Sequence, residues 1–141
     1  MRIAAYATLI KNNKVLLLRR HNTGYKDGLY SMIAGHVEGG ETIADATIRE
    51  AQEEAGIKIA RGDLGIAHTM HRMCPDVEYI DFFLTPVKWH GEPQVMENDK
   101  CDDLSWHPTN SLPENTIPYV RQAIEHIENG VTFSEFDERA Q

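Results

Sequence analysis

The chain has 141 residues, 41% of them hydrophobic, and a formal net charge of −8. This length suits a single domain with its own core, which we expect to span residues 1–141. No apolar run of about 18 residues occurs, so we expect no membrane span, and the acidic chain lacks the basic stripe of stable nucleic-acid binding. Two cysteines are too few for a disulfide framework and favour reduced thiols in a cytoplasmic protein.

The first forty residues predict strands and loops. Two strand-like runs, 2–10 and 14–20, are separated by a pair of Asn residues that favour a tight turn, so we expect a hairpin. A loop over 21–28 and a short strand over 29–34 follow. The next stretch, 35–41, holds three Gly residues and predicts an irregular loop.

From Thr42 onward the pattern becomes helical. Small or apolar residues recur at spacings of four, three and four and form one narrow stripe, consisting of Ala44, Ile48, Ala51 and Ala55. This stripe predicts a helix that lies close to a sheet and ends at Gly56, a natural C-terminal stop. Glu50, Glu53 and Glu54 fall on roughly the opposite side of this helix.

The C-terminal half predicts further strands and one more helix. The expected strands cover residues 57–60, 64–74, 77–89 and 104–108. Thr116 is the expected cap of a helix that ends at Gly130, and we expect the charged tail from about residue 132 to fray. The order of strands, helix, strands and helix favours an α+β arrangement or an α/β/α sandwich.

Three glutamates of the first helix, Glu50, Glu53 and Glu54, lie within barely more than one helical turn. Like charges three and four residues apart on a helix repel by roughly 0.2–0.5 kcal/mol per pair. A hard cation between these side chains would remove the repulsion, because Mg²⁺ and Mn²⁺ prefer oxygen ligands. The alternative is a solvated acidic face, which charge runs usually form.

The segment from Gly35 to Ile57 resembles the signature of the Nudix hydrolase family. That signature is Gly, five residues, Glu, seven residues, and then Arg-Glu-aliphatic-any-Glu-Glu-any-Gly-aliphatic. The chain supplies its fixed positions with Gly35, Glu41, Arg49, Glu50, Glu53, Glu54 and Gly56. The one departure is Ala51, the smallest residue acceptable at an aliphatic position. The resemblance implies a MutT-like, Nudix-type α/β/α sandwich with a mixed β-sheet.

The resemblance also implies a Mg²⁺ site on the acidic helix, with Mn²⁺ as the alternative. The expected metal ligands are Gly35 through its carbonyl, Glu50, Glu53, Glu54 and Glu97. The expected catalytic residues are Glu53, Glu54, Glu50 and Arg49, with Glu53 or Glu54 as the general base and Arg49 orienting a glutamate. The expected structural residues of the box are Gly40, Glu41 and Gly56. The rivals of Glu97 as the ligand from a distant loop are Asp99, Asp102 and Asp103.

Four residues are candidate substrate contacts: Arg19, Arg20, His36 and Asn115. Arg19 and Arg20 end a strand, where one of them would pair with phosphate; the alternative is a surface charge at a strand end. His36 lies in the glycine loop, and Asn115 resembles in position a purine-contacting Asn of MutT-type enzymes. Tyr25 and Tyr30 are either base-stacking or packing residues.

The leading functional hypothesis is hydrolysis of a nucleoside triphosphate, such as 8-oxo-dGTP or another (d)NTP, to the monophosphate and pyrophosphate. A second hypothesis is hydrolysis of ADP-ribose, a nucleotide sugar or a dinucleoside polyphosphate. A third, from another class, is a non-catalytic nucleotide-sensing module; the complete set of box acids argues against it. The expected partner is a small-molecule nucleotide, and a homodimer is left open.

Overall fold

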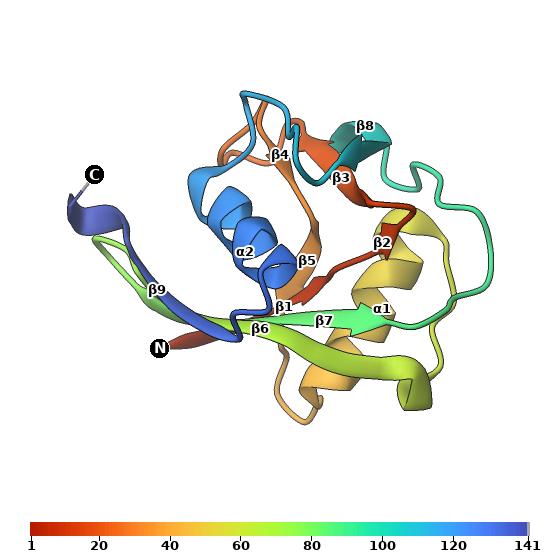
Figure 1. Ribbon diagram of the computed structural model, residues 1–141, viewed down its shortest axis with the longest axis horizontal. Coiled ribbons are helices and arrows are strands. Elements are labelled where there is room, and N and C mark those ends of the chain that lie inside the picture. The colour runs from red at the N-terminus through yellow and green to blue at the C-terminus, as the bar shows by residue number, and fades with distance from the viewer. Residues whose placement is uncertain (141) are drawn as a thin grey trace.

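Nine strands and two α-helices build the part of the chain that the computed structural model describes, residues 1–140 (Figure 1). The strands are β1 (Arg2–Ala7), β2 (Ile10–Lys11), β3 (Lys14–Arg20), β4 (Tyr30–Ser31), β5 (Ile33–His36), β6 (Leu64–Met73), β7 (Glu78–Pro86), β8 (Cys101–Pro108) and β9 (Phe133–Asp137). The helices are α1 (Ile43–Ala55) and α2 (Pro118–Glu128), with short 3₁₀ turns at Arg61–Asp63 and Glu138–Ala140. Residue 141, part of the expected single domain, lies outside the described residues.

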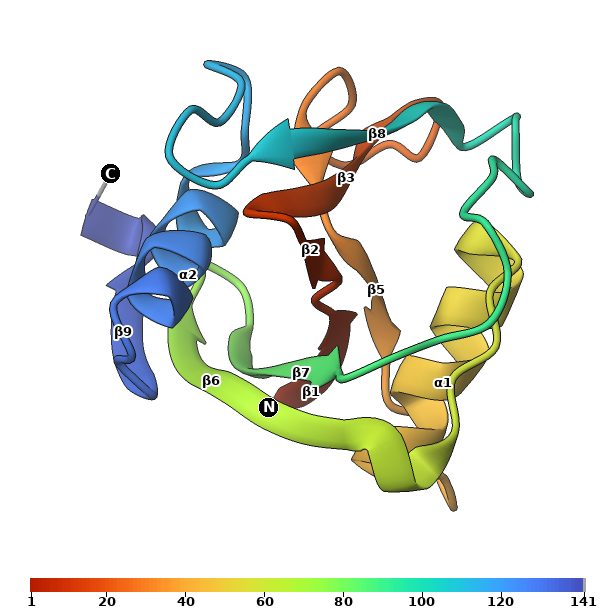
Figure 2. The ribbon, with the colours of Figure 1, turned by 45° about the vertical axis from the view of Figure 1, so that its right-hand side comes forward.

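The strands form two sheets. The first has the order β5-β1-β7-β6-β9 and is mixed, because β1 runs antiparallel to β5 but parallel to β7. The second is centred on β3, which pairs with β2, β4 and β8. The two helices lie on opposite sides of β1 and β5, as the turned view shows (Figure 2). The expected α/β/α sandwich with a mixed sheet is therefore confirmed.

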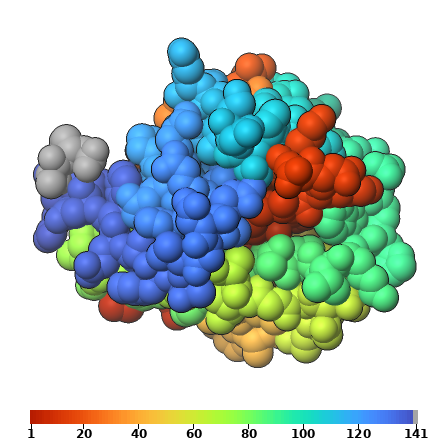
Figure 3. Space-filling view, viewed as in Figure 1, coloured from red at the N-terminus to blue at the C-terminus, as the bar shows by residue number. Residues whose placement is uncertain are grey.

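Each helix covers its own hydrophobic cluster. The cluster beneath α1 includes Ala51, Ala55 and Ile57, whereas the cluster beneath α2 includes Val120 and Ile124. In the space-filling view, α2 and β9 cover the left part of the visible face (Figure 3). None of the described helices combines the length and the apolar character that crossing a bilayer requires.

The predicted hairpin is confirmed only between β2 and β3. Ile10 pairs with Val15, and the turn residues Asn12 and Asn13 have φ values of 53° and 62°. Left-handed conformations at both central positions match the right-handed twist of the flanking strands. The single first strand predicted over 2–10 is wrong, because β1 pairs within the first sheet and the chain then passes to the second.

Helix α1 begins and ends where the sequence predicts. Thr42 accepts a hydrogen bond from the Asp45 backbone N–H, and the Asp45 carboxylate accepts one from the Thr42 backbone N–H. This reciprocal pair satisfies two otherwise unpaired donors at the helix start. Gly56 ends the helix at φ 68°, in the left-handed region that glycine adopts without steric cost.

The buried stripe of α1 is rotated from the predicted one. Ala51 and Ala55 are fully buried as expected, but Ala44 and Ile48 are only half-buried. Ala46 and Thr47 are buried in their place. Thr47 satisfies its hydroxyl by donating to the Ile43 carbonyl (2.9 Å), which lets a polar side chain enter the contact with the sheet.

The start of α2 corrects the predicted cap. The helix begins after Ile117, and no side chain caps it. Thr116 instead donates its hydroxyl to the Pro113 carbonyl (2.7 Å) in the preceding turn. Pro118 at the first helical position lacks an N–H and so reduces the need for a cap.

The C-terminal tail is ordered as a strand, so the prediction that it frays from about residue 132 is wrong for residues 133–137. Residues 133–137 form β9, which runs parallel to β6 and completes its edge. Phe136 contributes by packing against Tyr119 of α2, with ring centroids 6.2 Å apart. The charged residues of the tail suggested a frayed segment. They occur within a strand because every second side chain there faces solvent.

Other strand boundaries also differ from the prediction. The strand expected over 29–34 is split into β4 and β5, β5 extends through His36 into the expected loop, and β7 ends at Pro86. The segment 57–60 contributes only an isolated bridge between Lys58 and His90, because its apolar residues pack under α1 instead of joining a sheet. Strand β8 begins at Cys101, three residues earlier than predicted, because its polar first residues pair with the end of β3.

Candidate active site

The acidic face of α1 lines a cavity of about 450 Å³. Glu50, Glu53 and Glu54 reach its wall from the helix, and Glu97 reaches it from the loop before β8. The rivals Asp99, Asp102 and Asp103 are not part of this wall. The fold therefore brings together the four glutamates that the sequence analysis put forward as metal ligands.

Arg49 ties the helix carboxylates to the glycine loop. Its guanidinium donates to both oxygens of Glu41 at 2.7 and 3.0 Å, and to one oxygen of Glu50 at 2.6 Å. It also reaches Glu53 at 3.4 Å and the His36 carbonyl at 3.2 Å. Because a guanidinium presents its donors in a rigid planar fork, Arg49 fixes these groups relative to one another.

Glu41 in turn holds the loop that precedes α1. One of its oxygens accepts a hydrogen bond from the Glu38 backbone N–H at 3.1 Å. The two bonds from Arg49 hold the pKa of the Glu41 carboxyl below its usual value. Gly40, between these two glutamates, has a φ of 82°. These contacts make Glu41 part of the scaffold of the loop. Neither Glu41 nor Gly40 lines the cavity.

Glu54 is a partly buried carboxylic acid with two further carboxylates close by. Burial raises its pKa well above the usual value, and the neighbouring carboxylates of Glu50 and Glu97 raise it further. One Glu54 oxygen accepts a hydrogen bond from the Ala34 backbone N–H at 3.2 Å, which only partly offsets these effects. A carboxylate in this environment gains from a nearby cation.

The donor set fits a hard divalent cation. The cavity wall holds five carboxylates but only three cationic side chains, Arg20, Arg49 and Lys100. Within residues 1–140, no three acidic, histidine or cysteine side chains already converge as metal ligands, because Arg49 draws Glu50 and Glu53 toward itself. Oxygen ligands and surplus negative charge are the features that Mg²⁺ and Mn²⁺ require.

Gly35 is a glycine because the Glu50 carboxylate occupies the space of a side chain. A Cβ added at Gly35 would overlap Oε1, Cδ and Cγ of Glu50. Gly35 pairs with Ala5 in the first sheet, so its backbone has little room to move away. The glycine therefore permits the close approach of Glu50 to strand β5.

We expect Gly35→Ala to destabilise the protein by about 1–3 kcal/mol, the usual cost of overpacking a well-packed site. Urea denaturation at neutral pH measures the change. In a Glu50→Ala background the same substitution should cost much less, because the overlapping carboxylate is gone. Equal costs in the two backgrounds would show that the overlap does not determine the residue at this position.

Two cationic residues of the cavity wall are suited to bind phosphate. Arg20 lies at the end of β3, as the sequence analysis anticipated, and Lys100 lies just before β8. The sequence analysis missed Lys100, because a single lysine in a polar loop carries no recognisable pattern. Its position three residues after Glu97 was the only available signal.

Three other candidate contacts lie elsewhere. Arg19 pairs with Asp102 at 2.7 Å. It lines neither the acidic cavity nor a second cavity that adjoins it and is described below. Asn115 donates its amide to the Gly28 carbonyl at 2.9 Å and is also absent from both walls. Tyr30 is largely buried and donates its hydroxyl to Asp103 at 2.5 Å. These contacts account for all three side chains without a substrate.

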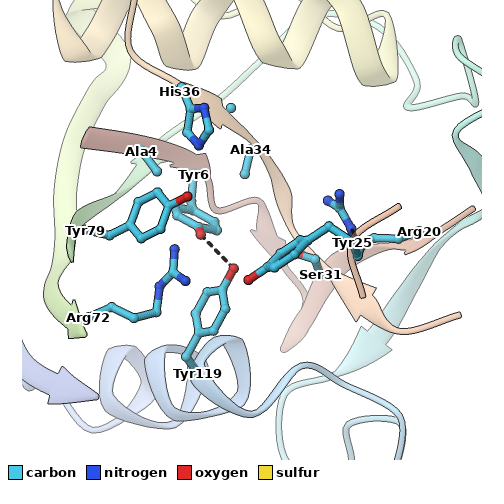
Figure 4. A pocket seen from close by; sticks show the side chains of 11 residues that line it. Ala4, Tyr6, Arg20, Tyr25, Ser31, Ala34, His36, Arg72, Tyr79 and Tyr119 are labelled. Atoms are coloured by element: carbon cyan, nitrogen blue, oxygen red, sulfur yellow. Dashed lines mark hydrogen bonds between the residues drawn. The ribbon is translucent and has the colours of Figure 1, made fainter. Parts of the chain in front are cut away.

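A second cavity of about 310 Å³ adjoins the acidic one, and the two share Arg20 and Ala34. Its wall is mainly aromatic, and Figure 4 shows rings from several elements around one space. These rings belong to Tyr6 of β1, Tyr25 of the loop before β4, His36 of β5, Tyr79 of β7 and Tyr119 of α2. We call this space the aromatic cavity.

Arg72 is the buried cation of the aromatic cavity. Its guanidinium lies 4.2 Å from the ring centre of Tyr79 and 4.0 Å from that of Tyr119. Asp81 accepts two hydrogen bonds from it, at 2.7 and 3.2 Å. The sequence analysis missed this group, although a charged residue inside each of two apolar strands was a visible signal of pairing.

Comparisons with known proteins agree with this geometry. The model of the NUDIX domain matches residues 1–127. The NAD-capped RNA hydrolase NudC of Vibrio atlanticus is 39% identical over 122 residues, which cover 86% of this chain and 43% of that protein. NudC of Pseudomonas aeruginosa is 28% identical over 117 residues, or 83% of this chain and 39% of that protein. The chain thus spans about two fifths of the length of these curated relatives.

An archaeal relative and a solved structure extend the comparison. The ADP-ribose pyrophosphatase of Methanocaldococcus jannaschii is 40% identical over 55 residues, 39% of this chain and 32% of that protein. The MutT NUDIX hydrolase structure from Burkholderia pseudomallei superposes with a TM-score of 0.80 at 24% identity, covering 88% of this chain and 95% of that one. This likeness shows a shared fold.

Proposed function

The chain belongs to the NUDIX family, and we propose on this premise that it is a Mg²⁺-dependent pyrophosphohydrolase of nucleoside triphosphates. The products would be a nucleoside monophosphate and pyrophosphate. The observation that carries the proposal is the junction of two cavities. Carboxylates and cations line the first, aromatic rings line the second, and Arg20 borders both.

The acidic cavity supplies the groups that hydrolysis of a phosphoanhydride needs. Glu50, Glu53, Glu54 and Glu97 would hold the cation. The Gly35 carbonyl, the fifth expected ligand, would join them from the wall of the adjoining aromatic cavity. A divalent ion held by these residues would neutralise phosphate charge and make the attacking water more acidic. Arg49 keeps the glutamates in position through its contacts with Glu41 and the loop.

The remaining roles follow from charge. Glu53 or Glu54 would take the proton from the water, because both project from α1 into the wall of the cavity. Arg20 and Lys100 would neutralise the phosphates. The nucleobase of the substrate would enter the aromatic cavity. Among the described residues, the only formally charged side chains in the wall of this cavity are Arg20 and Arg72, and Arg72 is paired with Asp81.

A second candidate function rests on the names of the relatives. The curated relatives include NAD-capped RNA hydrolases and an ADP-ribose pyrophosphatase. Hydrolysis of ADP-ribose or of another dinucleotide uses the same acidic cavity, and only the group beyond the phosphates differs. The two candidate functions therefore differ in which group of the substrate the aromatic cavity would bind.

A product-resolved screen tests the proposal. The wild-type protein is incubated with Mg²⁺ and, in turn, with normal and oxidised nucleoside triphosphates, ADP-ribose, diadenosine polyphosphates and NADH. We expect the fastest turnover with a nucleoside triphosphate, and no turnover in the presence of a chelator. Absence of turnover on every compound, with Mg²⁺ or Mn²⁺, would contradict the proposal and favour a binding module.

Mg²⁺ should also stabilise the fold. A ligand that binds only the native state at one hundred times its Kd contributes about 2.7 kcal/mol, and Glu50 and Glu54 would gain a counter-ion. We expect Tm to rise through a Mg²⁺ titration and to fall again when a chelator is added. An unchanged Tm over the whole titration would contradict cation binding to the substrate-free protein.

A further inference from the structure

The aromatic cavity differs from a general hydrophobic pocket in the chemistry of its polar atoms. Arg20 and Arg72 contribute only donors, whereas the hydroxyls of Ser31 and the tyrosines can donate or accept. The hydroxyls of Tyr6 and Tyr119 hydrogen-bond each other at 2.9 Å (Figure 4). No carboxylate or side-chain amide is found among the residues of its wall. Asp81, which lies outside the wall, is buried and accepts two hydrogen bonds from Arg72. The side chains of the cavity thus favour a ligand that accepts hydrogen bonds.

Charge in this cavity argues against a second phosphate. Asp81 neutralises the Arg72 guanidinium. A second carboxylate, that of Glu138, lies 3.8 Å from Arg72 Nη1. Arg2 donates a hydrogen bond to Nδ1 of His36 at 2.7 Å, so this ring nitrogen acts as an acceptor. Burial raises the pKa of Tyr119. An uncharged planar ring fits this environment better than an anion.

Arg72 retains donors for such a ring. A guanidinium has five N–H groups. Asp81 accepts from two of them and the Cys74 sulfur from a third at 3.4 Å. The position of Arg72 between Tyr79 and Tyr119 fixes the plane of the guanidinium at the cavity wall. A fixed donor at this place discriminates between ligands by what they present to it.

Tyr25 closes the same space from a surface loop. Its ring lies beside the cavity in Figure 4, and its side chain is close enough to Arg72 for the guanidinium to oppose the rise that burial causes in the Tyr25 pKa. The loop is held in shape by Arg20, which donates to the Tyr25 carbonyl at 2.7 Å. Asp27 adds hydrogen bonds from the Thr23 and Gly24 backbone N–H groups.

We propose that the aromatic cavity selects a nucleobase bearing a carbonyl oxygen, with Arg72 as the specificity-determining donor and Tyr25 as the ring that covers the base. Guanine, hypoxanthine, uracil and 8-oxopurines have such an oxygen, whereas adenine has none. This inference rests on the proposed function for the location of the phosphates. It favours the triphosphate of an oxo-base over ADP-ribose and the other adenine nucleotides.

Inosine and adenosine provide the matched test, because they differ only along one edge of the base. Position 6 is oxo in inosine and amino in adenosine, and N1 carries a hydrogen in inosine but a lone pair in adenosine. Nucleoside binding is measured by calorimetry without any metal, so it does not depend on catalysis. We expect inosine to bind about tenfold more tightly than adenosine, the factor typical of one hydrogen bond. Equal affinities, or tighter adenosine binding, would overturn the selection of an oxo-base.

Two variants identify the residues responsible. Arg72→Gln combined with Asp81→Asn replaces the fixed guanidinium by a shorter amide without leaving a buried carboxylate unpaired, and circular dichroism checks that it folds. We expect its preference for inosine to fall below about twofold. Tyr25→Ala, at an exposed loop position, should weaken inosine and adenosine alike by about tenfold, the effect of losing one stacking ring. An unchanged affinity of Tyr25→Ala would overturn the role of this ring.

Turnover separates this inference from the proposed function. Tyr25→Ala should raise KM for inosine triphosphate more than KM for ribose 5-triphosphate, which has no base. A smaller loss on the second compound is expected, because the Arg20 guanidinium lies over the Tyr25 ring, 5.3 Å from its centre. An equal loss on both compounds would overturn the assignment of Tyr25 to the base. If the wild type hydrolyses none of these compounds but still prefers inosine, the proposed function fails and the selection of an oxo-base stands.

Discussion

Glu54→Gln should lower kcat by about 10²–10⁴-fold, the usual contribution of a general base or of a carboxylate that positions the reacting water. The same substitution should leave Tm in metal-free buffer unchanged or raise it. Glutamine keeps the acceptor for the Ala34 N–H but removes the repulsion from Glu50 that raises the Glu54 pKa. Steady-state kinetics with saturating Mg²⁺ and a thermal melt in chelator measure the two effects.

The controls for this experiment use the same chemical change at other positions. Glu53→Gln should also lose turnover if Glu53 is the base, and the more damaged variant identifies which glutamate acts. Glu125→Gln, at an exposed position on α2 outside both cavities, should keep the wild-type rate. Wild-type turnover in both Glu53→Gln and Glu54→Gln would contradict the assignment of the general base to this helix.

Asp81→Asn should destabilise the fold by about 3–5 kcal/mol, because it leaves the buried Arg72 guanidinium with only the more distant Glu138 carboxylate, 3.8 Å from its Nη1. Asp81 is fully buried and Arg72 is 3% exposed, so water cannot replace the lost carboxylate. The guanidinium would remain between Tyr79 and Tyr119, whose faces attract a cation but do not neutralise it. The midpoint of urea unfolding measures the loss.

The exposed pair between Arg19 and Asp102 is the matched control. Both side chains are 39% exposed, so Asp102→Asn should change stability by less than about 1 kcal/mol. The double variant Arg72→Gln with Asp81→Asn should recover part of the loss, because neither charge is then buried alone. An unfolding midpoint of Asp81→Asn equal to that of the wild type would contradict the structural role of the pair.

The acidic cavity was the part most open to prediction from sequence. Glycine, arginine and glutamate positions at fixed spacing specify a loop, a helix and a set of carboxylates within one stretch of chain. The structure adds that Arg49 contacts three of these glutamates and that Gly35 makes room for one of them. Such contacts are local, so the spacing of the residues determines them almost completely.

The aromatic cavity was not predicted, because the rings of its wall come from five separate segments of the chain. Tyr6, Tyr79 and Tyr119 are far apart in the sequence and meet only because β1 pairs with β7 and α2 packs nearby. The register between strands decides which face each ring occupies. The tail strand β9 escaped prediction for a similar reason, since its stability depends on the edge of β6 and not on its own composition.

The most direct test of the central claim is a titration with Mn²⁺ followed by electron paramagnetic resonance. It is carried out on the wild type and on Glu50→Gln and Glu54→Gln, each with and without a non-hydrolysable nucleoside triphosphate. We expect the wild type to remove free Mn²⁺ from solution and each variant to bind it at least about tenfold more weakly, as expected when one charged ligand is lost. Equal Mn²⁺ affinity in the wild type and both variants, with and without nucleotide, would contradict a metal site on the acidic face of α1.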